Sequence, residues 1–82
     1  MQTILQNDDM NIGKNIRRLR KACKFTQVQV ASQLQVTGST ITESALIKIE
    51  GGYHTIVDRD IARLRKIFNC TFEDFFKGIP EN

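Results

Sequence analysis

The stretch FTQVQVASQLQVTGSTITESALIKIEGG, from Phe25 to Gly52, decides the fold predicted for this chain. It contains two short segments with apolar residues at helical spacing, each preceded by a threonine, and a polar connection between them. Threonine is a good N-cap because its hydroxyl accepts a backbone N–H of the first helical turn. The stretch therefore predicts two helices joined by a turn, held in place by the rest of the chain.

The first of these helices is predicted over Gln27 to Leu34, with Thr26 as its N-cap. Gln29 completes a capping box, and Phe25 and Val30 stand at the positions of a hydrophobic staple. The second helix is predicted over Glu43 to Gly51 with Thr42 as its cap, and Leu46 and Ile49 face inward. Gly51 and Gly52 are expected to end it through a left-handed backbone.

Three flanking helices complete an all-α prediction of five helices without strands. One covers Asn11 to about Lys24, where apolar residues recur at intervals of three and four. A fourth helix runs from a cap at Asp58 to about Phe68, and Asn69 is expected to adopt a left-handed turn. Thr71 and Asp74 cap the fifth helix, which contains Phe72, Phe75 and Phe76. The chain thus divides into a flexible lead-in (1–10), one domain (11–77) and a tail (78–82). The alternative for the lead-in is a functional arm.

Composition describes a small globular chain of 82 residues with 40% hydrophobic and 26% charged residues. The net charge of +3 is compatible with a polyanionic partner without requiring one. No leader or membrane-length apolar run is apparent, so a cytoplasmic protein without membrane association is expected.

The two cysteines, Cys23 and Cys70, fall on apolar faces, so buried reduced thiols are favoured over a disulfide or a reactive thiol. With His54 as the single histidine, they do not supply the close ligands of a zinc site. No catalytic set, phosphate loop or cofactor motif is present, so neither enzymatic activity, a cofactor nor a small-molecule ligand is expected.

The combination of Thr26-Gln27, Ala31, Leu34, Thr42 to Glu50 and Gly52 resembles the lambda-repressor-like helix-turn-helix domains of the Cro/XRE type. Further matching residues are Ile16-Arg17-Arg18-Leu19-Arg20 and the closing segment Cys70 to Phe76, so the resemblance covers Asn11 to Phe76. Three features depart from the family, and one of them is Glu43, which stands where the family often has Arg or Gln. The turn, Gln35 to Thr40, is about five residues longer than usual, and added loop length costs little free energy. Arg65 replaces a small apolar residue, where it could snorkel, pair with an acid or mark an interface.

The resemblance implies that the second helix of the motif lies in the DNA major groove. Base contacts would come from its outward residues, which are Glu43, Ser44, Ala45, Ile47 and Lys48. Glu43 could instead serve only the helix dipole, and Ile47 could contact a protein. Phosphate contacts would come from residues near helix starts, on the first helix and in the following loop, which are Arg17, Thr26, Gln27, Thr42, Tyr53, His54 and Thr55.

Two further expectations concern the first helix. Arg20 is expected, by resemblance, to form an ion pair with Glu50 that locks this helix to the second helix of the motif. The other cations between Lys14 and Lys24 are either a solvated face or a footprint for phosphate.

The function implied is a sequence-specific DNA-binding regulator, a repressor that binds double-stranded DNA at a near-palindromic site as a homodimer. The dimer face is expected at Phe75 or Phe76. The alternative is a protein-interaction module, such as an antitoxin-like subunit, built on the same helix-turn-helix scaffold.

Overall fold

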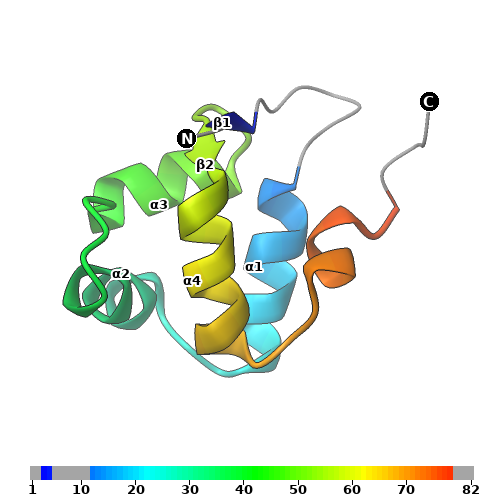
Figure 1. The fold of residues 1–82 in the computed structure, drawn as a ribbon, viewed down its shortest axis with the longest axis horizontal. Helices are drawn as coiled ribbons and strands as arrows, with labels where there is room; N and C mark the ends of the chain where they lie inside the picture. Colours follow the sequence, from blue (N-terminus) through cyan, green and yellow to red (C-terminus); the bar gives the residue numbers. More distant parts are fainter. Residues whose placement is uncertain (1–2, 5–11, 79–82) are drawn as a thin grey trace.

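The computed structural model describes residues 3–4 and 12–78, and this part of the chain is mostly helical (Figure 1). It contains the α-helices α1 (Gly13–Ala22), α2 (Gln27–Val36), α3 (Glu43–Glu50) and α4 (Asp58–Phe68). The expected fifth helix is a 3-10 helix of five residues, η1 (Phe72–Phe76), whose capping box between Thr71 and Asp74 is present. The helical content agrees with an all-α class, and the last element differs from the expectation in being a 3-10 helix.

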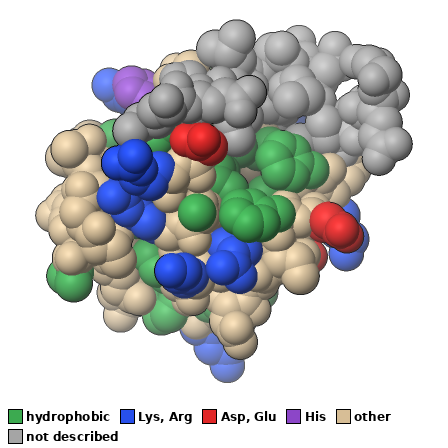
Figure 2. Space-filling model, viewed as in Figure 1, with side chains coloured by type: hydrophobic (Ala, Val, Ile, Leu, Met, Phe, Trp, Pro, Cys, Tyr) green, Lys and Arg blue, Asp and Glu red, His purple; other side chains and the backbone are tan. Residues whose placement is uncertain are grey.

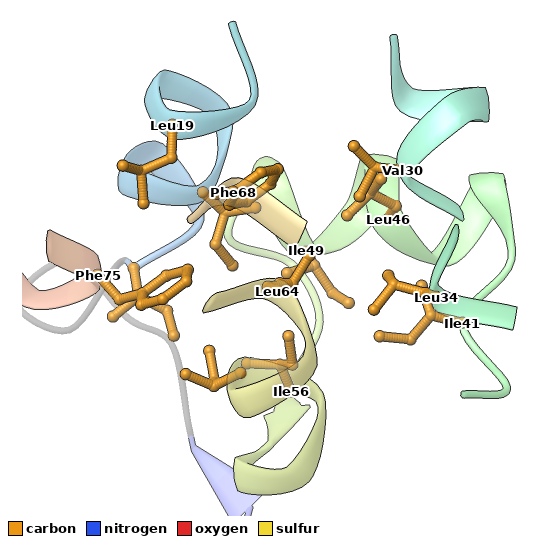
Figure 3. Close-up of a cluster of buried hydrophobic side chains, with 13 residues drawn as sticks. Leu19, Val30, Leu34, Ile41, Leu46, Ile49, Ile56, Leu64, Phe68 and Phe75 are labelled. Carbon is orange, nitrogen blue, oxygen red and sulfur yellow. The ribbon is translucent and has the colours of Figure 1, made fainter. Parts of the chain in front are cut away.

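One hydrophobic core joins all five helical segments (Figure 3). It contains Leu19 from α1, Leu34 from α2, Leu46 from α3, Leu64 from α4 and Phe75 from η1. α3 packs against both α1 and α2, α4 packs against α2 and η1, and η1 returns to α1. This arrangement covers one side of α3 and leaves its opposite side in solvent.

Two short strands were not predicted. β1 (Thr3–Ile4) pairs antiparallel with β2 (Ile56–Val57), and Ile4 lies opposite Ile56. Two residues of the expected lead-in therefore belong to the folded structure. The other lead-in residues, 1–2 and 5–10, and the last four residues of the expected tail, 79–82, lie outside the described residues.

The connection between α2 and α3 is shorter than expected because α2 includes Gln35 and Val36, which the sequence placed in the turn. The Gln35 Nε2 atom donates to the Ile41 carbonyl oxygen at 3.1 Å. Ser39 is buried, and its Oγ accepts the N–H of Ile41 at 3.1 Å. The segment Thr37–Thr42 is consequently an internally hydrogen-bonded turn that sets the start of α3.

α4 begins one residue earlier than its predicted cap allows. Val57 is its N-cap without a side-chain hydrogen bond, and Asp58 is the first helical residue. The extended backbone of β2 ends at Val57, so the helix follows directly. At the other end, Asn69 adopts the expected left-handed conformation with φ of 52°.

Both cysteines are free, as expected, but they are only partly buried against the core, where the sequence predicted buried thiols. The Cys23 thiol donates to the Phe68 carbonyl oxygen at 3.5 Å, and burial raises the pKa of the Cys70 thiol. Arg65 makes a contact that was not among the expected alternatives, since its guanidinium carbon lies 5.3 Å from the centroid of the Phe72 ring.

Candidate nucleic-acid interface

The solvent side of α3 presents four side chains of different chemistry. Leu46, Ile49 and Glu50 are buried, which fixes the rotation of the helix about its axis. The exposed side chains are Glu43, Ser44, Ile47 and Lys48. Ala45 was also expected to face outward, but it is half-buried and packs against the core. Four of the five expected base-contact residues therefore share an accessible face.

The starts of α2 and α3 are fixed by the two predicted threonine caps. The Thr26 hydroxyl accepts the N–H of Gln29 at 3.1 Å, and Gln29 Oε1 accepts the N–H of Thr26 at 2.8 Å. The capping box is therefore confirmed. The Thr42 hydroxyl accepts the N–H of Ala45 at 3.2 Å. Both threonines are exposed, so each helix begins at the protein surface, where N–H groups attract anions.

A buried ion pair connects α1 to the end of α3. Arg20 donates from Nε to Glu50 Oε2 at 2.7 Å and from Nη2 to Oε1 at 3.0 Å. Arg20 also donates to the Phe25 carbonyl oxygen at 2.9 Å, and Gln27 Nε2 donates to Glu50 Oε1 at 3.2 Å. The expected pair is present, and Gln27 extends it into a network that ties α1, α2 and α3 together.

A surface hollow of about 410 Å³ lies beside this network. Its lining combines the network residues Arg20, Gln27 and Glu50 with four residues of α1, α3 and the following loop, namely Arg17, Ile47, Lys48 and Tyr53, and with Gly51. We call this the α1–α3 hollow. Glu50 is neutralised by Arg20, so Arg17 and Lys48 leave the hollow with a net positive charge. The second Nε2 hydrogen of Gln27 and the Tyr53 hydroxyl are further potential donors.

Gly51 has a role that the sequence did not reveal. Its φ is −80°, an ordinary helical value, whereas Gly52 has φ of 82° and makes the expected left-handed turn. A Cβ atom at Gly51 would lie 2.9 Å from Cδ2 of the Tyr53 ring. A side chain at this position would displace the Tyr53 ring, so the glycine lets Tyr53 lie at the edge of the hollow while remaining 87% exposed.

The remaining residues of the expected phosphate set lie elsewhere. His54 and Thr55 line a second hollow of about 240 Å³ together with Ile41 and Ala45, next to β2. The α1–α3 hollow brings together only Arg17, Gln27 and Tyr53 from that set. The expected phosphate contacts thus separate into three groups: the residues at the α1–α3 hollow, the residues near β2, and the N-caps Thr26 and Thr42.

The cationic hollow is suited to a phosphate or another oxyanion, because positive charge and hydrogen-bond donors surround it. Within residues 3–4 and 12–78, no cluster of His, Cys, Asp and Glu could hold a metal ion. None of the helices there is long and apolar enough to cross a membrane. Comparisons with protein-family models, curated proteins and solved structures found no match.

Proposed function

We propose that this chain is a sequence-specific DNA-binding regulator of the Cro/XRE type, in which α2 and α3 form the helix-turn-helix. The observation that supports it most directly is the exposed face of α3, which carries Ser44 and Lys48 and adjoins the α1–α3 hollow. A groove-reading helix needs polar side chains for base edges and adjacent cations for the backbone. This surface offers both.

In this proposal α3 lies in the major groove and α2 crosses the phosphate backbone. Lys48 donates to guanine acceptors, Ser44 bonds to a base edge, and Ile47 contacts a thymine methyl group. Arg17, Gln27 and Tyr53 hold one phosphate at the hollow, and the caps of α2 and α3 approach others. The Arg20–Glu50 network keeps the two sets of contacts in register.

A homodimer is part of the proposal, since a single motif reads too few base pairs to be selective. Phe75 is fully buried, so the expected dimer contact at this residue is excluded by the fold. The exposed rings are Phe72 (49%) and Phe76 (37%). On the face formed by α4 and η1, hydrophobic side chains group beside Lys and Arg (Figure 2). We assign the dimer contact to Phe72 and Phe76, and sedimentation showing only monomer with and without DNA would contradict it.

The biological role that follows is repression in the cytoplasm by occlusion of a promoter, without a cofactor or a small-molecule ligand. A protein-interaction module is the second candidate. It is favoured by Ile47, which is 47% exposed on α3, and by the acidic Glu43 beside it. An acid near phosphates weakens DNA binding, and an exposed isoleucine suits an apolar protein contact.

Salt dependence separates these two candidates. The purified chain would be titrated with a labelled random-sequence duplex at several salt concentrations between about 50 and 200 mM. DNA binding predicts that the logarithm of affinity falls linearly with the logarithm of salt. The R17Q/K48Q variant should bind more weakly with a smaller slope, whereas the matched R59Q/K66Q control should not. Absence of binding at the lowest salt would contradict the DNA-binding proposal.

A further inference from the structure

The positive charge of this chain is concentrated on one helix. Six of the twelve Lys and Arg residues lie between residues 12 and 24, and that segment has no acidic residue. The other six are outnumbered by nine Asp and Glu, so the rest of the chain carries a net charge of −3. The net charge of +3 is therefore entirely due to α1 and the two residues that follow it.

Only part of this charge serves the fold. Arg20 is committed to Glu50, and Arg18 donates to the Asp74 carbonyl oxygen at 3.1 Å. The side chains of Lys14, Arg17 and Lys21 are exposed and make no hydrogen bond or ion pair with the described part of the chain. They lie three and four residues apart, so they form one stripe along the helix, opposite the core stripe of Ile12, Ile16 and Leu19.

This stripe is unfavourable for an isolated helix. Like charges three and four residues apart repel one another, and no acid on α1 compensates. The helix dipole favours cations only in the last turn, where Lys21 lies, and it disfavours Lys14 in the first turn. A solvated surface face would gain from mixed charges, so the arrangement of Lys14 and Arg17 is better suited to binding an anionic partner.

The stripe is continuous with the candidate interface, because Arg17 also lines the α1–α3 hollow beside Lys48. From Lys14 to Lys21 it extends about 10 Å along the axis of α1. Adjacent phosphates on one DNA strand advance about 3.4 Å along the duplex axis, so a cationic row of this length spans several of them. Such a row fits a phosphate backbone better than it fits a single small anion.

We propose that Lys14 and Lys21, joined to the hollow through Arg17, form a second track for the DNA phosphate backbone. The inference rests on the proposed DNA-binding function. It adds sequence-independent contacts that do not involve α2, α3 or the loop after α3. The track increases affinity and salt dependence equally for all sequences, because phosphate contacts carry no base information.

The test compares K14Q/K21Q with R59Q/K66Q, which removes the same charge from α4. Glutamine has a helix propensity close to that of lysine and arginine, and thermal melting would verify that both variants fold. For a duplex that the wild type binds, each lost phosphate contact lowers the salt slope by about 0.9. K14Q/K21Q should lower it by about 2 and leave the ratio of affinities for matched and mismatched sites unchanged. R59Q/K66Q should keep the wild-type slope. Because Arg59 lies beside Phe72 of the proposed dimer contact, sedimentation would verify that this variant assembles as the wild type does.

Two results would overturn the track: a wild-type slope for K14Q/K21Q, or an equal reduction in both variants, which would indicate only a general charge effect. Either can occur while the wild type still binds DNA, so the proposed function would stand. If the wild type binds no duplex at any salt concentration, the proposed function itself fails.

Discussion

Loss of one partner of the Arg20–Glu50 ion pair should destabilise the protein far more than replacement of both. The two side chains are 10% and 3% exposed. In Glu50→Leu, the Arg20 guanidinium keeps only the Phe25 carbonyl as its acceptor. In Arg20→Met, the Glu50 carboxylate keeps only the single hydrogen bond from Gln27. Each variant leaves a largely buried charge without its counterion.

Removal of one member of a buried pair typically costs about 3–5 kcal/mol. A domain of this size has a free energy of unfolding of about 4–12 kcal/mol, so either single variant should lose at least about a quarter of its stability and would unfold at the lower end of this range. The double variant R20M/E50L replaces both charges by apolar groups of similar volume, which is often neutral or stabilising. The double variant still removes the partners of the Phe25 carbonyl oxygen and the Gln27 side-chain amide. We therefore expect its free energy of unfolding to lie within about 2 kcal/mol of the wild-type value.

Urea unfolding followed by circular dichroism would give the four free energies of this cycle. A coupling energy of at least about 2 kcal/mol is expected between the two positions. The reasoning would be refuted if the loss of unfolding free energy in the double variant equalled the sum of the two single losses within about 0.5 kcal/mol. The folded double variant would also test whether the ion pair positions α3. If it does, the DNA affinity of this variant should stay below the wild-type value although its stability is regained.

Three further predictions follow from local geometry. Gly51→Ala should displace the Tyr53 ring, whose Cδ2 lies 2.9 Å from the added Cβ, and should lower DNA affinity as much as Tyr53→Ala does; wild-type affinity in an anisotropy titration would contradict this. Lys24→Gly should stabilise the protein by up to about 1 kcal/mol in urea unfolding, because Lys24 has φ of 61°; a loss of stability would show that the left-handed backbone is not strained. The N–H of Thr71 lowers the pKa of Asp74 below its usual range. The Asp74 carboxylate therefore stabilises the fold above its unfolded-state pKa, and this contribution is lost as pH falls through its folded-state pKa. The free energy of unfolding of Asp74→Asn, measured by urea unfolding at several pH values, should consequently fall less on acidification than that of the wild type.

Local sequence signals predicted the helix starts well. The capping residues Thr26, Thr42 and Thr71 all accept the expected N–H groups, because a cap and its partner lie within three residues of each other. The left-handed Asn69 is local in the same way. The Arg20–Glu50 pair spans thirty residues, and only the family resemblance made it predictable.

Features that depend on distant segments were missed. The pairing of β1 with β2 joins two-residue segments that have no periodicity to detect. Asn15 was overlooked within a basic helix, yet it is buried and donates from Nδ2 to the carbonyl oxygens of Phe75 and Lys77 at 2.8 and 2.9 Å. These bonds hold η1 against α1, which is consistent with Phe75 pointing inward while Phe76 stays accessible. Neighbouring phenylalanines give no such distinction in the sequence.

The sequence predicted which kinds of residue form the candidate site better than it predicted how they are arranged in space. Exposure of Ser44, Ile47 and Lys48 follows from the burial of Leu46 and Ile49 at helical spacing. The sequence does not predict that Tyr53 and His54 lie at different hollows, because their positions depend on how the loop after Gly52 passes to β2. Gly51 offered one usable signal: two adjacent glycines where only one left-handed residue is needed to end a helix.

Selection of binding sites by the purified protein from a random duplex pool tests the central claim most directly. Sequence readout by α3 predicts recovery of a short motif, repeated as two half-sites about one helical turn apart if the protein binds as a dimer. Ser44→Ala or Lys48→Ala should then relax particular positions of that motif. A pool that shows no enrichment after selection, with only weak salt-sensitive retention, would contradict DNA reading by this helix.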